Sequence, residues 1–295
     1  MTNRTGAGLW IAGARPRTLP AALVPVAVGA ACATGSADPS WWRTVLAAVV
    51  SLALQVGVNY ANDYSDGVRG TDAERVGPLR LVGSGSVPAA SVKRAAFASL
   101  AVACVAGLVL ALLTTLWLVV VGACAVLAAW FYTGGPRPYG YAGLGEVFVF
   151  VFFGLVATAG TAYVVGGEVT AAAWWAGSTA GCFSCALLVV NNLRDIPGDT
   201  RAGKRTLAVR LGDPGTRKMF VALFAAAALC TVAASVAAGP WALLGLAGVG
   251  AASPAVGAVR GGALGPALVP VLGAVGRAQL VLGVFFSAGL VLALA

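Results

Sequence analysis

The sequence predicts an all-α membrane protein with about nine transmembrane helices around a central cavity. Hydrophobic residues make up 59% of the 295 residues and charged residues only 10%, whereas soluble domains carry about 25% charged residues. The apolar segments are continuous and about 20 residues long, which is the length of a spanning helix. A β-barrel would instead show short segments that alternate between apolar and polar residues. The 40 glycines suit a bundle in lipid, where small residues let helices approach closely.

The first four expected helices occupy the first 133 residues. Segment 18–37 follows three arginines, and we interpret it as a retained helix and not as a signal peptide, because eight further apolar segments follow. Segment 42–64 is almost entirely apolar from Val45 to Val58 and then ends in Asn and Asp residues. Segments 95–113 and 116–133 are apolar runs separated by a very short turn.

Five more segments complete the expected bundle. Segment 145–165 begins with the strand-like run VFVFVFF, but it stays apolar for too long to be a strand. Segment 170–192 ends in a second group of Asn and Asp residues. The last three expected spans are 217–238, 241–259 and 278–294.

The charges indicate which way the chain crosses the membrane. If nine spans alternate, 18 of the 19 basic residues fall on one side, and only Arg43 falls on the other. The positive-inside rule then places the N-terminus and the two long loops, 65–94 and 193–216, in the cytoplasm. We expect residues 1–295 to form a single polytopic membrane domain. Eight of the ten acidic residues share the cytoplasmic side, although topology does not require them there.

The second expected span ends in a polar stripe. Its members are spaced i, i+3, i+4 and i+7, which places them on one helix face: Asn59, Asn62, Asp63 and Asp66. An aspartate at mid-helix costs about 2.5–3.5 kcal/mol on insertion scales and less near the interface. One such residue could simply end a helix at the membrane surface, but a repeated pattern argues for function.

The sixth expected span repeats the pattern. Asn191, Asp195 and Asp199 follow one another at intervals of four residues, and Pro197 with Gly198 predicts a helix end there. If the two stripes face each other, their oxygens suit Mg²⁺, which often bridges to a substrate phosphate. The predicted metal ligands are Asp63, Asp66, Asp195 and Asp199. The basic residues placed to meet a diphosphate are Arg69, Arg75, Arg80, Arg137, Lys204 and Arg205.

The two motifs resemble those of the UbiA-type superfamily of intramembrane aromatic prenyltransferases. The spacing of two residues between Asp63 and Asp66 departs from the commonest superfamily pattern, which leaves Asp66 and Asp72 as alternative ligands. Within the superfamily the chain is similar to the bacterial 1,4-dihydroxy-2-naphthoate polyprenyltransferases of menaquinone biosynthesis. The matching stretches are ARPRTLPAALVPV (14–26), NYANDYSDGVRGTD (59–72), GPLRLVGSG (77–85), YTGGPRPYGYAGLGE (132–146) and NNLRDIPGDTRAGKRTLAVRLG (191–212).

The resemblance implies a nine-helix ring in a bacterial inner membrane and Mg²⁺-dependent transfer of a polyprenyl group from its diphosphate to 1,4-dihydroxy-2-naphthoate. Loss of CO₂ would give demethylmenaquinone. Arg15 or Arg17 would hold the acceptor carboxylate, and aromatic rings would stabilise an allylic cation; the candidates are Tyr64, Tyr132, Tyr139, Phe148 and Phe152. The expected substrate-binding residues are Asn59, Asn62, Asn191, Arg15, Arg17, Arg69, Asp72, Arg80, Tyr132, Arg137, Lys204 and Arg205.

Two other functions fit the same residues. A related enzyme could use 4-hydroxybenzoate, homogentisate or another acceptor with unchanged metal chemistry. A cation-coupled transporter could also carry carboxylates in its bundle, but transporters tend to place them at the membrane midplane. The expected partners are the two substrates and the lipid bilayer, with no nucleic acid. The sequence leaves the prenyl length, the oligomeric state and any general base open.

Overall fold

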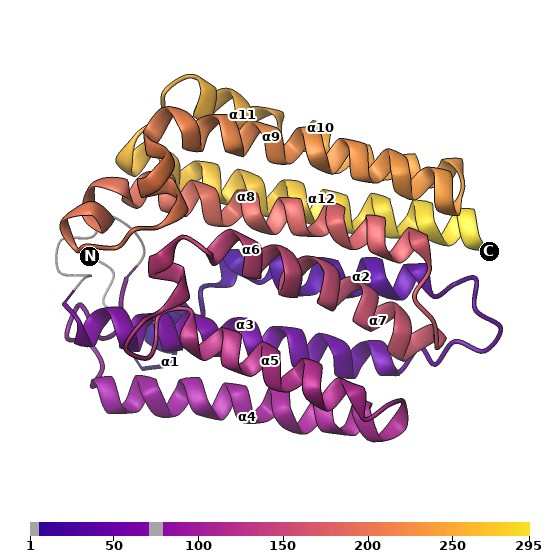
Figure 1. Cartoon of the computed structure of the whole chain (residues 1–295), viewed down its shortest axis with the longest axis horizontal. Helices are drawn as coiled ribbons and strands as arrows, with labels where there is room; N and C mark the ends of the chain where they lie inside the picture. Colours follow the sequence, from indigo (N-terminus) through magenta and orange to yellow (C-terminus); the bar gives the residue numbers. More distant parts are fainter. Residues whose placement is uncertain (1–5, 71–78) are drawn as a thin grey trace.

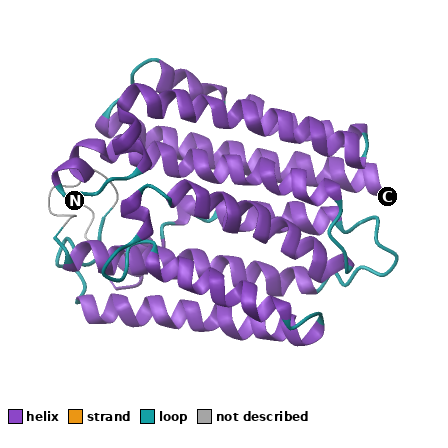
Figure 2. Cartoon of the chain, in the orientation of Figure 1, coloured by secondary structure: helices purple, strands orange, loops and turns teal. Residues whose placement is uncertain are grey.

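The structure is a computed structural model that describes residues 6–70 and 79–295. Within these two ranges all regular elements are helices, as Figure 2 shows, so the predicted all-α class is confirmed. The first half contains α1 (Gly6–Ala14), α2 (Pro20–Cys32), α3 (Arg43–Val68), α4 (Ala89–Leu113), α5 (Trp117–Phe131), α6 (Gly145–Phe150) and α7 (Ala157–Gly166). The second half contains α8 (Ala171–Arg201), α9 (Leu207–Ala238), α10 (Leu246–Ala251), α11 (Ser253–Arg260) and α12 (Leu268–Leu294).

Seven helical segments of the described chain are long and apolar enough to cross a bilayer. Two of the nine expected segments, 18–37 and 116–133, hold shorter apolar helices, which are α2 with 13 residues and α5 with 15. At 1.5 Å per residue these extend about 20 and 22 Å, less than a hydrocarbon core of about 30 Å. The chain is therefore a multi-pass membrane protein, and the count of nine spans stays a prediction.

The long helices run side by side along the longest axis of the molecule (Figure 1). α8 packs against α9, α3 packs against α4, and α2 lies between α7 and α12. The largest buried cluster joins α8, α9 and α12, where Phe183 meets Phe224 edge to face with 5.1 Å between ring centroids. We call the end at which α3 stops at Val68 and α8 stops at Arg201 the motif end.

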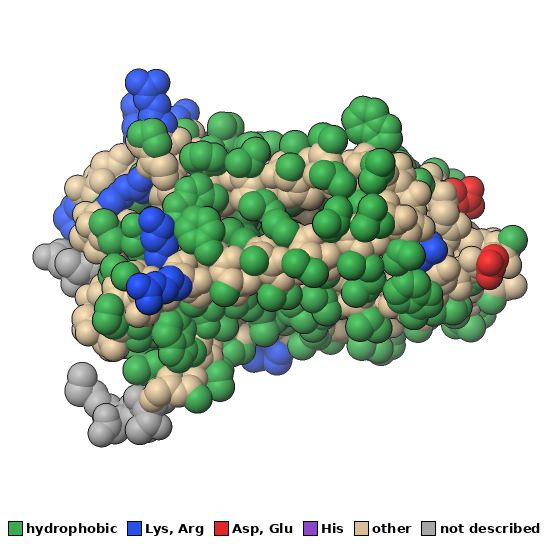
Figure 3. Space-filling view, turned by 90° about the horizontal axis from the view of Figure 1, so that it is seen from below, with side chains coloured by type: hydrophobic (Ala, Val, Ile, Leu, Met, Phe, Trp, Pro, Cys, Tyr) green, Lys and Arg blue, Asp and Glu red, His purple; other side chains and the backbone are tan. Residues whose placement is uncertain are grey.

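The surface of the bundle fits a bilayer. In Figure 3 hydrophobic side chains cover the flank, and most of the visible Lys and Arg side chains gather at the motif end. Large apolar residues on the flank are highly exposed, with Val236 at 84% and Trp117 at 75%. Exposed apolar areas of this extent mark an interaction surface, and on helices long enough to cross a bilayer they fit contact with lipid.

The expected helix over 145–165 forms, but it contains a π-helical turn over Val151–Val156. This turn packs closely on α8, because a Cβ atom on Gly154 would lie only 2.5 Å from the Cα atom of Gly181. A π turn fits one extra residue into the helix and often occurs at functional sites. Here it belongs to the wall that Phe152 and Phe153 present to the central cavity.

Several expected boundaries were wrong. Pro197 and Gly198 do not end α8, which continues to Arg201, because a proline near a helix end removes only one amide donor. α12 begins at Leu268, ten residues before the expected start of the last span. The expected loops 65–94 and 193–216 are helical at both ends, so the acidic stripes stand on rigid helices.

Candidate active site

A cavity of about 750 Å³ lies inside the bundle, with walls from α3, α5, α7 and α8. At the motif end its lining is polar and charged, whereas the deeper part is lined by apolar residues that include Leu110, Leu118 and Val164. This volume lies within the usual range for ligand sites. The cavity therefore has an apolar interior and a charged opening at the motif end, which we call the mouth and which includes Asp66, Asp195 and Lys204.

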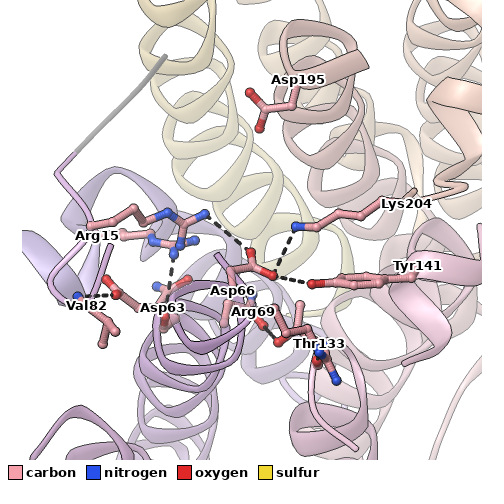
Figure 4. A network of polar contacts seen from close by, with 12 residues as sticks. Arg15, Asp63, Asp66, Arg69, Val82, Thr133, Tyr141, Asp195 and Lys204 are labelled. Carbon is pink, nitrogen blue, oxygen red and sulfur yellow. Dashed lines mark hydrogen bonds and ion pairs between the residues drawn. The ribbon is translucent and has the colours of Figure 1, made fainter. Parts of the chain in front are cut away.

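The α3 wall contributes Asn59, Asn62 and Asp66 to the cavity lining. Asp66 is 4% exposed, and its Oδ1 accepts hydrogen bonds from the Tyr141 hydroxyl at 2.6 Å and from Lys204 Nζ at 3.0 Å. Arg80 Nη2 lies 4.0 Å from the other carboxylate oxygen. Figure 4 shows Asp66 at the centre of this network, which holds three segments of the chain together.

Asp63 behaves differently from Asp66. Its two carboxylate oxygens accept hydrogen bonds from the backbone amides of Leu81 and Val82, each at 2.9 Å, and the residue is fully buried. Asp63 does not belong to the cavity lining. It occupies the edge of the polar stripe that faces the segment after residue 79, whose amides need acceptors. In this structure Asp63 therefore anchors the backbone of Leu81 and Val82, and its role as a metal ligand stays a prediction.

Asp63→Asn should lower the thermal stability of the protein, because one buried backbone amide loses its acceptor at a cost of about 1–3 kcal/mol. The added stabilisation by Mg²⁺ with a non-hydrolysable diphosphate should persist in this variant, since the cavity keeps its own carboxylates. Thermal unfolding with and without these ligands measures both quantities. An unchanged melting temperature combined with lost ligand stabilisation would instead make Asp63 a metal ligand.

The α8 wall contributes the second acidic stripe, Asn191, Asp195 and Asp199, to the same cavity. Asp195 accepts two hydrogen bonds from its neighbour Arg194, from Nε at 2.7 Å and from Nη2 at 2.9 Å. The Arg194 side chain is only 1% exposed. Adjacent helical residues rarely face each other, so this pair could not be predicted from the spacing of the residues.

The expected basic residues divide into two groups. Arg15, Arg80 and Lys204 line the cavity. Four others do not line it: Arg17, Arg69, Arg137 and Arg205. Spacing along the chain could not separate the groups, because the direction of each side chain depends on the tertiary packing of its loop. Asp72 and Arg75 lie outside the described residues.

Two of the arginines outside the cavity lining, Arg69 and Arg205, hold a connecting segment in place. The Arg69 guanidinium donates to the backbone carbonyls of Thr133 and Gly135, and it stacks over the Tyr141 ring at 5.2 Å. The Arg205 backbone amide donates to the Tyr141 carbonyl at 3.0 Å. Both contacts hold the connection between α5 and α6 against the motif end.

Several lining residues were not expected from the sequence. Tyr141, Asn192 and Arg201 line the charged mouth. Asn192 Nδ2 donates to the buried Glu146 carboxylate at 2.9 Å, which fixes the amide. The only sequence signal for Asn192 is its place beside Asn191.

The pKa values of Lys204 and Tyr141 at the mouth are both changed by burial and by the nearby Asp66 carboxylate. Burial alone would lower the pKa of Lys204, but the Asp66 carboxylate and Tyr141 outweigh it, so its pKa is raised above the ordinary value for lysine. The pKa of Tyr141 is raised by burial and then by the charge of Asp66. Lys204 is therefore a cation and Tyr141 a neutral hydrogen-bond donor at neutral pH.

Aromatic residues line the cavity next to the charged mouth. Tyr139 and Phe148 stack with 4.0 Å between ring centroids, and Phe148 lies 6.2 Å from Phe152. Tyr132 also lines the cavity. Tyr64, the fifth expected aromatic residue, stacks on Trp130 outside the cavity lining.

Comparison with known families identifies this architecture. The model of the UbiA prenyltransferase family matches residues 22–262, which include both acidic stripes and most of the cavity walls. The chain belongs to the UbiA prenyltransferase family. This membership favours an enzyme over the transporter.

Curated relatives within the UbiA family support the assignment. The chain is 52% identical over 272 residues to 1,4-dihydroxy-2-naphthoate octaprenyltransferase of Mycobacterium tuberculosis, covering 92% of this chain and 93% of that protein. It is 35% identical over 235 residues to the Escherichia coli protein of the same name, covering 75% and 74%. Among solved structures, a UbiA homolog from Archaeoglobus fulgidus bound to DMAPP and Mg²⁺ has a TM-score of 0.62 at 16% identity, covering 95% of this chain and 98% of that one. That likeness concerns the fold alone.

The donor set of the mouth fits a magnesium ion that is shared with a substrate. Within residues 6–70 and 79–295, no three His, Cys, Asp or Glu side chains lie close enough to form a metal cluster. Mg²⁺ usually keeps several waters and binds one or two carboxylates plus substrate phosphates. Asp66 on α3 and Asp195 and Asp199 on α8 supply such carboxylates from opposite walls.

Proposed function

We propose that the protein transfers a polyprenyl group from polyprenyl diphosphate to 1,4-dihydroxy-2-naphthoate, with Mg²⁺ and with loss of CO₂. One observation supports this reaction most strongly: carboxylates from two walls meet at the mouth of a cavity whose interior is apolar. The names of the M. tuberculosis and E. coli relatives support the same acceptor. The motif end then faces the cytoplasm of a bacterial cell membrane, where soluble acceptor arrives.

The donor diphosphate would bind at the charged mouth. Asp66, Asp195 and Asp199 would hold Mg²⁺ in company with the Asn191 amide. When bound, Mg²⁺ neutralises charge on the departing diphosphate as a Lewis acid. The lining carries five basic residues against three carboxylates: Arg15, Arg80, Arg194, Arg201 and Lys204. This excess of positive charge suits a diphosphate and a carboxylate-bearing acceptor bound together.

The acceptor would bind beside Arg15. Arg15 lies in the left-handed region at φ 54°, and its Nη2 approaches the Asn59 carbonyl at 3.5 Å. Thr18 and Gln55 hydrogen-bond each other next to it and line the same wall. Arg15 would hold the acceptor carboxylate, while the two polar side chains would orient the ring hydroxyls. Arg17 lies outside the lining, and this supports Arg15 as the residue that we propose for the role.

The reaction balances without an oxidant. The diphosphate leaves with the electron pair of the broken carbon–oxygen bond, and the faces of Tyr139, Phe148 and Phe152 stabilise the allylic cation. The ring carbon that bears the carboxylate supplies the electron pair of the new carbon–carbon bond. The bond from this carbon to the carboxylate then breaks, its electron pair restores the aromatic ring, and CO₂ leaves. No electrons pass to another molecule, so demethylmenaquinone is released in its reduced, quinol form.

Purified protein in lipid, given radiolabelled octaprenyl diphosphate and a panel of acceptors, tests the proposal. We expect a prenylated product and CO₂ only with 1,4-dihydroxy-2-naphthoate, and no product after Mg²⁺ is removed by chelation. Adding Mg²⁺ back should restore the product. Product from 4-hydroxybenzoate or homogentisate in its place would assign a different acceptor, and full turnover in chelator would contradict the role of Mg²⁺.

A further inference from the structure

Arg277 occupies an unusual position on α12. The helix begins at Leu268, so Arg277 lies nine residues, or about 14 Å, along its axis. It belongs to a stripe of the helix whose residues are spaced by three or four positions and are exposed except for the half-buried Gly273: Pro270, Gly273, Arg277, Leu280 and Val284. Leu280 and Val284 are 48% and 68% exposed. A cation on this stripe therefore faces the lipid.

The depth of Arg277 follows from the length of the helix. α12 has 27 residues and extends about 40 Å, which exceeds a hydrocarbon core of about 30 Å by roughly 10 Å. A helix centred in the bilayer would then place the Arg277 backbone inside the hydrocarbon edge. The Arg277 side chain points back along the helix toward the motif end, which brings its charge nearer to the membrane surface. Its Nη1 lies 3.5 Å from where a Cβ on Gly273 would be, and Gly273 is one helical turn closer to that end. The missing side chain at Gly273 leaves room for the guanidinium to snorkel toward the headgroups.

A second exposed arginine, Arg17, lies on a turn whose backbone touches α12. The backbone oxygen of Arg17 lies 3.3 Å from where a Cβ on Gly276 would be, so the short turn Pro16–Thr18 touches α12 one residue before Arg277. Arg17 is exposed and lies outside the cavity lining. Among the described residues, no acidic side chain forms an ion pair with Arg17 or Arg277. Arg17 and Arg277 are thus two exposed cations on neighbouring backbone segments, and neither forms an ion pair with an acidic side chain in residues 6–70 or 79–295.

We propose that Arg17 and Arg277 form a binding site for the phosphate of an anionic phospholipid. An uncompensated cation at this depth is costly, and a lipid phosphodiester supplies the missing negative charge together with acyl chains for the exposed leucine and valine. Guanidinium groups bind phosphate oxygens in a bidentate manner. The site lies outside the central cavity and does not depend on the reaction proposed for it.

Native mass spectrometry of the full chain, released from a zwitterionic detergent, tests this site. Phosphatidylglycerol and phosphatidylcholine with the same acyl chains are titrated separately. We expect the wild type to bind the first phosphatidylglycerol about tenfold more tightly than phosphatidylcholine. The double variant Arg17→Gln with Arg277→Gln should lose that preference. The control Arg260→Gln, an exposed arginine at the end of α11, should retain it.

Three results would overturn the proposal. The wild type could show no preference, the double variant could keep the preference, or millimolar inorganic phosphate could displace the lipid, which would make the site a phosphate site without lipid specificity. If the double variant aggregates, Arg277→Lys provides the second measurement. It keeps the charge but loses the planar fork, so the preference should fall by about two- to threefold; an unchanged preference would contradict a bidentate phosphate contact.

Discussion

Asp195→Asn and Asp66→Asn are each expected to lower prenyl transfer by at least about 10²–10³-fold, the loss seen when one preorganised electrostatic group is removed from a reaction centre. Each substitution keeps the size of the side chain and removes one negative charge from the cavity mouth. The charge matters because the lining already holds more basic residues than carboxylates, so one carboxylate less weakens the hold on a divalent cation. Turnover with saturating Mg²⁺ and labelled donor measures the effect.

A matched control separates this effect from general damage. Asp213→Asn makes the same chemical change at a residue that is paired with Arg217 at 2.6 Å and lies outside the cavity lining. A half-exposed ion pair of this kind contributes little to stability. We expect Asp213→Asn to keep near-normal turnover. Near-normal turnover in Asp195→Asn as well would end the assignment of the α8 carboxylate to the reaction.

Gly122→Phe is expected to change which donors the protein accepts. Gly122 lines the cavity on α5, and a Cβ atom there would meet no protein atom within 4 Å, so the new ring would occupy the cavity. Gly122 lies ten residues before Tyr132, or about 15 Å deeper along the helix direction. A geranyl chain bound at the mouth should end before it reaches Gly122, whereas an octaprenyl chain must extend past Gly122.

The expected result is a loss of kcat/KM for octaprenyl diphosphate of about tenfold or more, with geranyl diphosphate changed by less than about twofold. Overfilling a packed site costs about 1–3 kcal/mol, and each 1.36 kcal/mol is a factor of ten in rate. Gly257→Phe is the matched control, because Gly257 is exposed on α11, also has open space at its Cβ, and does not line the cavity. Equal losses for both donors would place the prenyl chain elsewhere.

The approximate positions of the helices could be predicted from the sequence, because a continuous apolar segment of about 20 residues is long enough to cross a bilayer as a helix. Each of the nine expected segments contains an apolar helix. The end of α8 and the start of α12 could not be predicted as well. Pro197 is a strong signal for a helix end, yet the helix continues through it to Arg201 and keeps Asp199 on the same face as Asp195. Local signals of this kind give way when neighbouring helices and caps satisfy the backbone.

The sequence by itself determined that acid and amide side chains stand on one face of each of two helices, because the helical repeat of 3.6 residues fixes which positions share a face. It could not decide which members of a stripe face the cavity. Only the tertiary structure separated Asp66, which binds Lys204 and Tyr141 at the mouth, from Asp63, which binds two backbone amides of a distant segment. The same holds for Arg15 inside the cavity and Arg17 outside it. These choices depend on which group from elsewhere in the chain comes within hydrogen-bonding distance, and spacing along one helix carries no information about that group.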